Sequence, residues 1–275
     1  MILLSETKIR QLLSNDQIQH SLAIHVFDSI NSTNRYLKEL PREYKVDLCC
    51  AETQTQGRGR FAREWFSPFG ENIYCSTRWN LGKNPADLSA LSLVTGLAVI
   101  ATLNELDIAD NIAIKWPNDL IWQDKKLCGV LIESFKESNG EIIVIIGIGL
   151  NVNSSTHKET IQAQLDRPWC SLLEITKQSW DRNLIIAKLI IQLEQHINRL
   201  MATGFSTFIT TWEKWDYLYG KQIEGTNLLG GFQGMADGVD NSGQLILIDN
   251  NGLKHYISSG EASLCGNRRE IICKL

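Results

Sequence analysis

The sequence has no hydrophobic run long enough to cross a bilayer. Its longest apolar stretch, residues 142–150, is interrupted by two glycines, whereas a membrane-spanning helix needs roughly 18 or more apolar residues. The N-terminal region also lacks a basic segment followed by an apolar core, as a secretory signal would have. These absences argue against secretion and membrane insertion, so we expect a cytoplasmic protein with no membrane partner.

Metal-binding and disulfide patterns are also missing. The seven cysteines are odd in number and form no C-x-x-C pair, and the five histidines show no H-x-H or H-x-x-x-H spacing. The cysteines are therefore expected to be reduced and mostly buried thiols, and a zinc site is not expected.

Basic residues are not in excess, and there is no internal repeat. With 27 Lys and Arg against 31 Asp and Glu, the formal net charge is -4. This balance argues against a dedicated nucleic-acid-binding protein, although it leaves room for a local basic site. The overall composition, with 43% hydrophobic residues, is that of an ordinary globular protein.

Hydrophobic periodicity predicts an α+β domain followed by a small all-β domain. Helical patterns occur at residues 5–13, 33–40, 88–106, 182–201 and 205–217. Strand patterns occur at residues 22–27, 46–51, 72–79, 112–116, 120–122, 127–134 and 141–150. After Gly220, glycines become dense and short β-runs alternate with turns. We therefore predict domains at residues 1–219 and 220–275, the second a small β-barrel.

One loop combines glycines, arginines and a tryptophan. Gly57 and Gly59 allow the backbone to approach a ligand closely, and the forked donors of Arg58, Arg60 and Arg63 suit carboxylate or phosphate. Trp65 could stack on a planar base. By itself, this loop could also be a flexible surface segment or a contact for RNA.

Three further segments contain candidate binding groups. In Lys115–Asp119, an Asn-Asp pair could bind a ribose, a base edge or Mg²⁺; in Lys126–Glu133, Lys126 opens an otherwise apolar strand. The third, Gly147–Asn153, has alternate glycines that leave one strand face bare, but it lacks the third glycine of a dinucleotide-binding fingerprint. Taken singly, the first segment could be an ordinary turn, the second could carry a solvated lysine, and the third could be a strand packed closely against a helix.

Together and in this order, these segments resemble the catalytic region of biotin–protein ligases. The resemblance covers nearly the whole chain and implies a class II synthetase-like mixed β-sheet flanked by helices, with an SH3-like C-terminal barrel. The matching strings are residues 28–34, 57–63 with Trp65, 115–119, 126–133, 147–151 and, in the barrel, 259–264.

The resemblance also implies roles for individual residues. Lys126 and Arg60 would be catalytic, and Asp119 would be a partner for Mg²⁺. The nucleotide would be bordered by Arg63, Trp65, Asn118 and Asn151. Biotin would be bound by Ser32, Thr33, Asn34, Gln54, Gly57, Arg58, Gly59, Arg60, Lys126, Gly129, Leu131 and Gly149.

The implied reaction uses ATP, Mg²⁺ and biotin. Biotin is activated to biotinyl-5′-AMP and then transferred to a lysine in the biotin-carrier domain of a carboxylase. A sheet edge could form a homodimer. Many bacterial relatives begin with a DNA-binding winged helix, but here only about one helix precedes the Ser32–Asn34 motif, so we expect no DNA binding.

Two residues depart from the family pattern. Ala62 stands where the loop commonly has a glycine, which we expect to stiffen the loop without abolishing activity. Cys265 stands where some relatives have an arginine near the nucleotide, a place that Arg268 or Arg269 could take.

The sequence is also compatible with two other functions. A lipoate–protein ligase would share the fold and the chemistry of acyl activation. A nucleic-acid-binding module would instead use Arg58, Arg60 and Arg63 on phosphates, against which the acidic balance counts.

Overall fold

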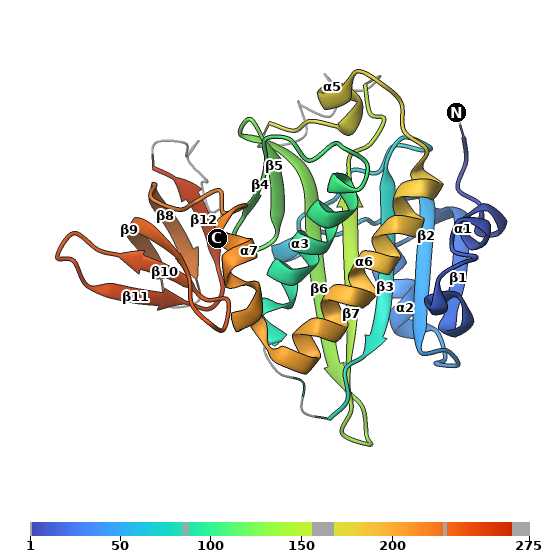
Figure 1. The fold of residues 1–275 in the computed structure, drawn as a ribbon, viewed down its shortest axis with the longest axis horizontal. Coiled ribbons are helices and arrows are strands. Elements are labelled where there is room, and N and C mark those ends of the chain that lie inside the picture. Colours follow the sequence, from blue (N-terminus) through green and yellow to red (C-terminus); the bar gives the residue numbers. More distant parts are fainter. Residues whose placement is uncertain (1, 84, 86–87, 156–167, 228–229, 266–275) are drawn as a thin grey trace.

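A seven-stranded mixed sheet forms the centre of the protein in a computed structural model that describes residues 2–83, 85, 88–155, 168–227 and 230–265 (Figure 1). The strand order is β1-β2-β3-β7-β6-β5-β4. Only β1 and β2 pair in parallel; the other neighbours are antiparallel. The strands are β1 Leu22–Ile30, β2 Val46–Gln54, β3 Ile73–Asn80, β4 Ile112–Lys115, β5 Asp119–Trp122, β6 Lys125–Lys136 and β7 Ile142–Leu150. The predicted α+β class with a mixed sheet is confirmed.

Helices cover both faces of this sheet. α3 (Leu91–Asn104) and α6 (Arg182–Thr203) cross one face and pack on each other, while α2 (Thr33–Glu39) lies on the opposite face against β2 and β3 (Figure 1). The shorter helices are α1 Glu6–Leu12, α5 Leu172–Thr176 and α7 Ile209–Glu213. α3 is buried on nearly all sides because it lies between the sheet and α6. Among the described helices, none has the length and hydropathy needed to span a membrane.

The C-terminal strands form a separate antiparallel sheet in the order β11-β10-β9-β8-β12. They are β8 Gln222–Asn227, β9 Gly230–Val239, β10 Leu245–Ile248, β11 Lys254–Ile257 and β12 Glu261–Leu264. The turn before β10 contacts the larger domain, since Gly243 accepts a 3.1 Å hydrogen bond from the indole of Trp116. A Cβ atom at Gly243 would lie 2.9 Å from Ala90, so this turn needs glycine for close packing. The domain boundary at 219/220 stays a prediction.

The cysteines that the structure describes are free thiols, and all but Cys265 are buried. Burial raises the pKa of Cys49 and of Cys128, which keeps these thiols protonated and unreactive. This agrees with the expectation of reduced, structural cysteines.

Candidate active site

A cavity of about 370 Å³ lies on the α2 side of the central sheet. Its floor comes from residues that pair across three strands: Tyr74 of β3 opposite Gly149 of β7, and Gly149 opposite Gly129 of β6. In the next row, Gly147 pairs with Leu131. Side chains at alternate strand positions point to the same face, so the glycines create a shallow trough between larger neighbours.

The indole of Trp65 lies in this trough. A Cβ atom at Gly149 would be 2.4 Å from Trp65 Cε2, and one at Gly129 would be 2.9 Å from Trp65 Cζ3. We expected the glycine-lined face to be left open for a ligand; instead, the indole covers part of it. Trp65 Nε1 is buried without a hydrogen-bond partner in the described structure, which makes it a donor for a bound ligand.

Polar side chains close one end of the cavity. The Gln54 side-chain oxygen accepts hydrogen bonds from the Thr33 backbone N at 2.9 Å and from Thr33 Oγ1 at 3.1 Å. Asn34 accepts from Ser76 Oγ at 2.5 Å and donates to Glu133 Oε2 at 2.8 Å. This network fixes donors and acceptors around a site suited to a small neutral polar group. Sequence reasoning assigned no role to Ser76 or Glu133, because each looks like an ordinary strand residue.

Ser32 also lies at this end of the cavity, where it caps α2. Its Oγ accepts from the backbone N of Arg35, which positions the helix that carries Thr33 and Asn34.

The glycine-arginine loop borders the cavity and contacts the C-terminal sheet. Arg60 Nη1 donates to the Gly260 carbonyl at 3.0 Å and to Asn118 Oδ1 at 3.4 Å. Arg63 forms two hydrogen bonds with the Glu261 carboxylate, at 2.5 and 2.6 Å. Burial lowers the pKa of the Arg60 guanidinium, so a bound anion would relieve the cost of holding this charge away from water. Sequence analysis included Glu261 in the matching string 259–264 but assigned it no role.

Lys126 and Asp119 form an ion pair inside the cavity, with 2.7 Å between Nζ and Oδ1. The backbone of Lys126 is held by Pro168, whose carbonyl accepts its N–H at 2.9 Å. The ammonium lies 5.3 Å from the centre of the Trp65 ring. No group of three or more His, Cys, Asp or Glu side chains in the described part of the chain is arranged to hold a metal ion. The metal role of Asp119 therefore stays a prediction.

Two asparagines and a tryptophan lie toward the other end of the cavity. Asn118 donates to the Val130 carbonyl at 2.8 Å, and Asn151 donates to the Cys170 carbonyl at 3.0 Å. These bonds orient both side chains within the cavity wall. Trp169 also lines the cavity, and its buried Nε1 has no hydrogen-bond partner in the described structure. No sequence motif pointed to Trp169, which follows Pro168.

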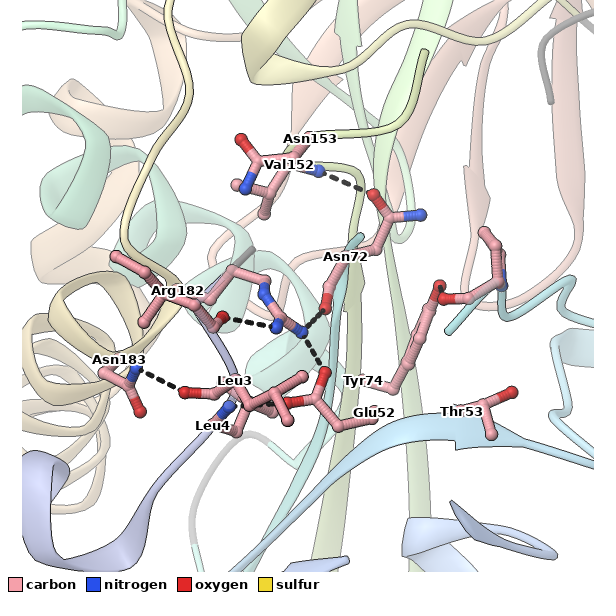
Figure 2. A network of polar contacts seen from close by, with 12 residues as sticks. Leu3, Leu4, Glu52, Thr53, Asn72, Tyr74, Val152, Asn153, Arg182 and Asn183 are labelled. Carbon is pink, nitrogen blue, oxygen red and sulfur yellow. Dashed lines mark hydrogen bonds and ion pairs between the residues drawn. The ribbon is translucent and has the colours of Figure 1, made fainter. Parts of the chain in front are cut away.

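A buried ion pair supports the wall formed by Asn72. Arg182 Nη1 lies 2.5 Å from Glu52 Oε2, and both side chains are 1% exposed. Figure 2 shows the Arg182 guanidinium between Glu52 and Asn72, where it also donates to the Asn72 carbonyl at 3.1 Å. The Asn72 side chain in turn accepts from the backbone N of Val152 at 2.9 Å. This network joins α6 to the strand ends that border the cavity.

Apart from Gly57, all of the predicted site residues line this one cavity. Gly57 lies on the outer side of the loop, where a Cβ atom would be 2.6 Å from the Trp65 carbonyl. A side chain at position 57 would therefore collide with the backbone of Trp65 on the other side of the loop, so this position needs glycine. The individual binding roles stay predictions, and Arg268 and Arg269 lie outside the described residues.

Comparison with known proteins finds two family models that match different parts of the chain. The model of the biotin/lipoate A/B protein ligase family matches residues 26–153, and that of the biotin protein ligase C-terminal domain matches residues 219–265. The bifunctional ligase/repressor BirA of Salmonella typhimurium is 35% identical over 260 residues, which cover 92% of this chain and 79% of the relative. The BirA of Bacillus subtilis is 31% identical over 260 residues, covering 93% and 78% of the two chains.

Solved structures agree. The biotin protein ligase from Aquifex aeolicus in complex with biotin and ATP has a TM-score of 0.75 and 31% identity, and the match covers 88% of this chain and 97% of that one. The chain therefore belongs to the biotin/lipoate A/B protein ligase family, and its C-terminal sheet is a biotin protein ligase C-terminal domain.

Proposed function

We propose that this protein is a biotin–[acetyl-CoA-carboxylase] ligase, which activates biotin with ATP to biotinyl-5′-AMP and transfers it to a lysine of a biotin-carrier domain. The observation that carries the proposal is a cavity with a neutral polar end and an apolar floor, in which Lys126 and Arg60 are among the cationic side chains of the lining. The two family models that match the chain and the similarity to the Aquifex aeolicus complex with biotin and ATP support it.

The chemistry explains why two cations are needed. A carboxylate oxygen of biotin must attack the α-phosphorus of ATP, and both groups are anionic. Lys126 and Arg60 offset this repulsion and stabilise charge as pyrophosphate leaves. The acceptor lysine, as a neutral amine, then attacks the carbonyl carbon, so that an amide forms and AMP leaves.

In this proposal, the ends of the cavity bind different parts of the intermediate. Ser32, Thr33, Asn34 and Gln54 bind the ureido ring, and Gly129, Gly149 and Leu131 line the slot for the ring and chain. The adenylate lies beside Arg63, Trp65, Asn118 and Asn151. To these we add Trp169, whose buried indole N–H faces the same cavity without a partner in the described structure.

Mg²⁺ would accompany ATP, and it would supply charge neutralisation on the phosphates. The carboxylate nearest to Lys126, that of Asp119, is already paired with this lysine. The cavity therefore offers at most a partial metal site, and we assign no step of the reaction to the metal.

The C-terminal domain favours biotin over lipoate as the substrate, since the matching model is that of biotin protein ligases. A nucleic-acid-binding role for the loop is disfavoured because Arg60 and Arg63 are engaged by Gly260 and Glu261. A cytoplasmic location, a homodimer and the absence of DNA binding stay predictions.

Incubation with biotin, ATP and Mg²⁺, followed by mass spectrometry, tests the proposal. We expect biotinyl-AMP in the absence of acceptor, and a biotinylated lysine once a carrier domain is added. Lipoate in place of biotin serves as the matched comparison. Adenylation of lipoate but not of biotin would replace our proposal by the alternative.

A further inference from the structure

A buried ion pair outside the cavity lies on the same face of the sheet. Asp47 of β2 and Arg78 of β3 are partners in register, and their side chains are only 3% and 4% exposed. Arg78 donates to Asp47 Oδ2 from Nη2 at 2.7 Å and from Nε at 3.0 Å. Because side chains alternate along a strand, Arg78 occupies the row next to Ser76, which contacts Thr33 and Asn34.

The remaining contacts of Arg78 reach the C-terminal end of α2. Its Nη1 donates to the carbonyls of Leu37 at 2.8 Å and Leu40 at 2.5 Å, and its Nη2 donates to that of Pro41 at 3.1 Å. Carbonyl groups at this end of a helix lack partners within the helix, so the guanidinium satisfies them. Ser76 contacts the beginning of α2, and β3 therefore holds the helix at both ends.

There is little room for α2 to shift on the sheet. A Cβ atom at Gly147 would lie 2.3 Å from Asn34 Oδ1, and Leu37 is fully buried against Cys49 and Ile145. Close-packed interiors transmit displacements rather than absorb them. A change at the C-terminal end of this 7-residue helix is therefore carried to Thr33 and Asn34.

We propose that Arg78 and Asp47 are positioning residues for the biotin end of the cavity. They do not contact the ligand; they hold α2 in the orientation in which Ser32, Thr33 and Asn34 face it. The inference rests on the proposed function, because it takes biotin as the ligand at that end. If only a fraction of the molecules hold α2 in this orientation, the apparent affinity for biotin falls in proportion to that fraction.

The test compares biotin binding with ATP use in Arg78→Lys. A single ammonium cannot bond Asp47 and three carbonyls at once, as the forked guanidinium does. We expect the calorimetric Kd for biotin to rise about tenfold, with kcat at saturating biotin and the KM for ATP within about twofold of wild type. Backbone amides of residues 33–39 should exchange faster with deuterium.

A second variant separates positioning from stability. Arg78→Met with Asp47→Leu removes both buried charges, a replacement that often preserves stability, and it should weaken biotin binding as Arg78→Lys does. Leu193→Ala, in the core on the α6 side of the sheet, is the matched control. It should lower the unfolding free energy while leaving biotin affinity unchanged.

Biotin binding within about twofold of wild type in both Arg78 variants, or equal weakening by Leu193→Ala, would overturn the proposal. A rise in the KM for ATP as large as the loss of biotin affinity would also overturn it. Failure of the wild-type protein to bind biotin would instead refute the proposed function, so the two outcomes are distinguishable.

Discussion

Glu261 in the C-terminal sheet forms two hydrogen bonds with Arg63 in the glycine-arginine loop, although 198 residues separate them in sequence. The neighbouring Gly260 carbonyl accepts from Arg60 of the same loop. At its other side, the C-terminal sheet is anchored to the catalytic domain through Gly243 and Trp116. The C-terminal domain thus holds the loop at the mouth of the cavity, where a mixed anhydride must be kept from water.

Glu261→Gln should loosen this attachment. The pair is partly exposed, so removing the carboxylate charge should cost about 0.5–1 kcal/mol. We expect the adenylate to hydrolyse about two to five times faster than in the wild type. The measurement adds the acceptor at increasing times after adenylate formation and determines how much adenylate is still available for transfer. Asp237→Asn, which removes the exposed ion pair to Lys254 in the same domain, is the control. Equal effects of both variants would argue against a role in holding the loop.

Lys126→Ala should suppress adenylate formation. It removes the ammonium that offsets the two reacting anions and leaves Asp119 without its partner at 2.7 Å. We expect a fall of about 100-fold or more in the rate of biotinyl-AMP formation, measured in a single turnover. Lys125→Ala provides the comparison, because the adjacent Lys125 pairs with Glu174 and does not line the cavity. Undiminished adenylation in Lys126→Ala would remove the assigned role.

The motifs in the sequence contain most of the predicted residues that line the cavity, because these residues fall in a few short segments of the chain. Most strands of the sheet also followed from hydrophobic patterns, whereas the mixed sheet was implied by the family resemblance. The tertiary contacts of each motif were harder to predict from the sequence. The alternate glycines predicted a bare strand face, yet only the fold shows that the indole of Trp65 lies against Gly129 and Gly149.

Other contacts had no local signal in the sequence. The Glu261–Arg63 pair joins two domains, and Trp169 reaches the cavity from an irregular segment. Arg78 and Asp47 resemble exposed strand residues until the register of β2 and β3 places them beneath α2. Each contact depends on tertiary arrangement, which single-sequence patterns do not encode.

Gly149→Ala should displace the Trp65 indole. The added methyl group would lie 2.4 Å from Trp65 Cε2, and such overpacking typically costs about 1–3 kcal/mol. An indole displaced from the sheet into the cavity would narrow the slot, so we expect biotin binding to weaken about 5- to 150-fold, as measured by calorimetry. Gly231→Ala in β9 has no neighbour closer than 3.7 Å and serves as the control. Unchanged binding in Gly149→Ala would show that Trp65 leaves this trough when biotin enters.

Substitution of Ala62 tests how the loop tolerates its departure from glycine. Ala62 has φ +58° and follows Phe61 at φ +55°, so two consecutive side chains occupy the left-handed region. Ala62→Gly removes about 1 kcal/mol of backbone strain from the left-handed conformation. Glycine also increases the conformational entropy that the loop loses when it becomes ordered, which costs about 0.5–1 kcal/mol. The two effects nearly offset each other, so adenylate retention should stay within about threefold of wild type.

Ala62→Val should behave differently, because a β-branched residue is strongly disfavoured at positive φ. We expect an about tenfold faster loss of the adenylate to hydrolysis, with the rate of its formation less affected because Lys126 and Arg60 are unchanged. The two variants share one position and differ only in backbone preference. Wild-type retention in Ala62→Val would therefore mean that residue 62 leaves the left-handed region once the loop closes over the adenylate.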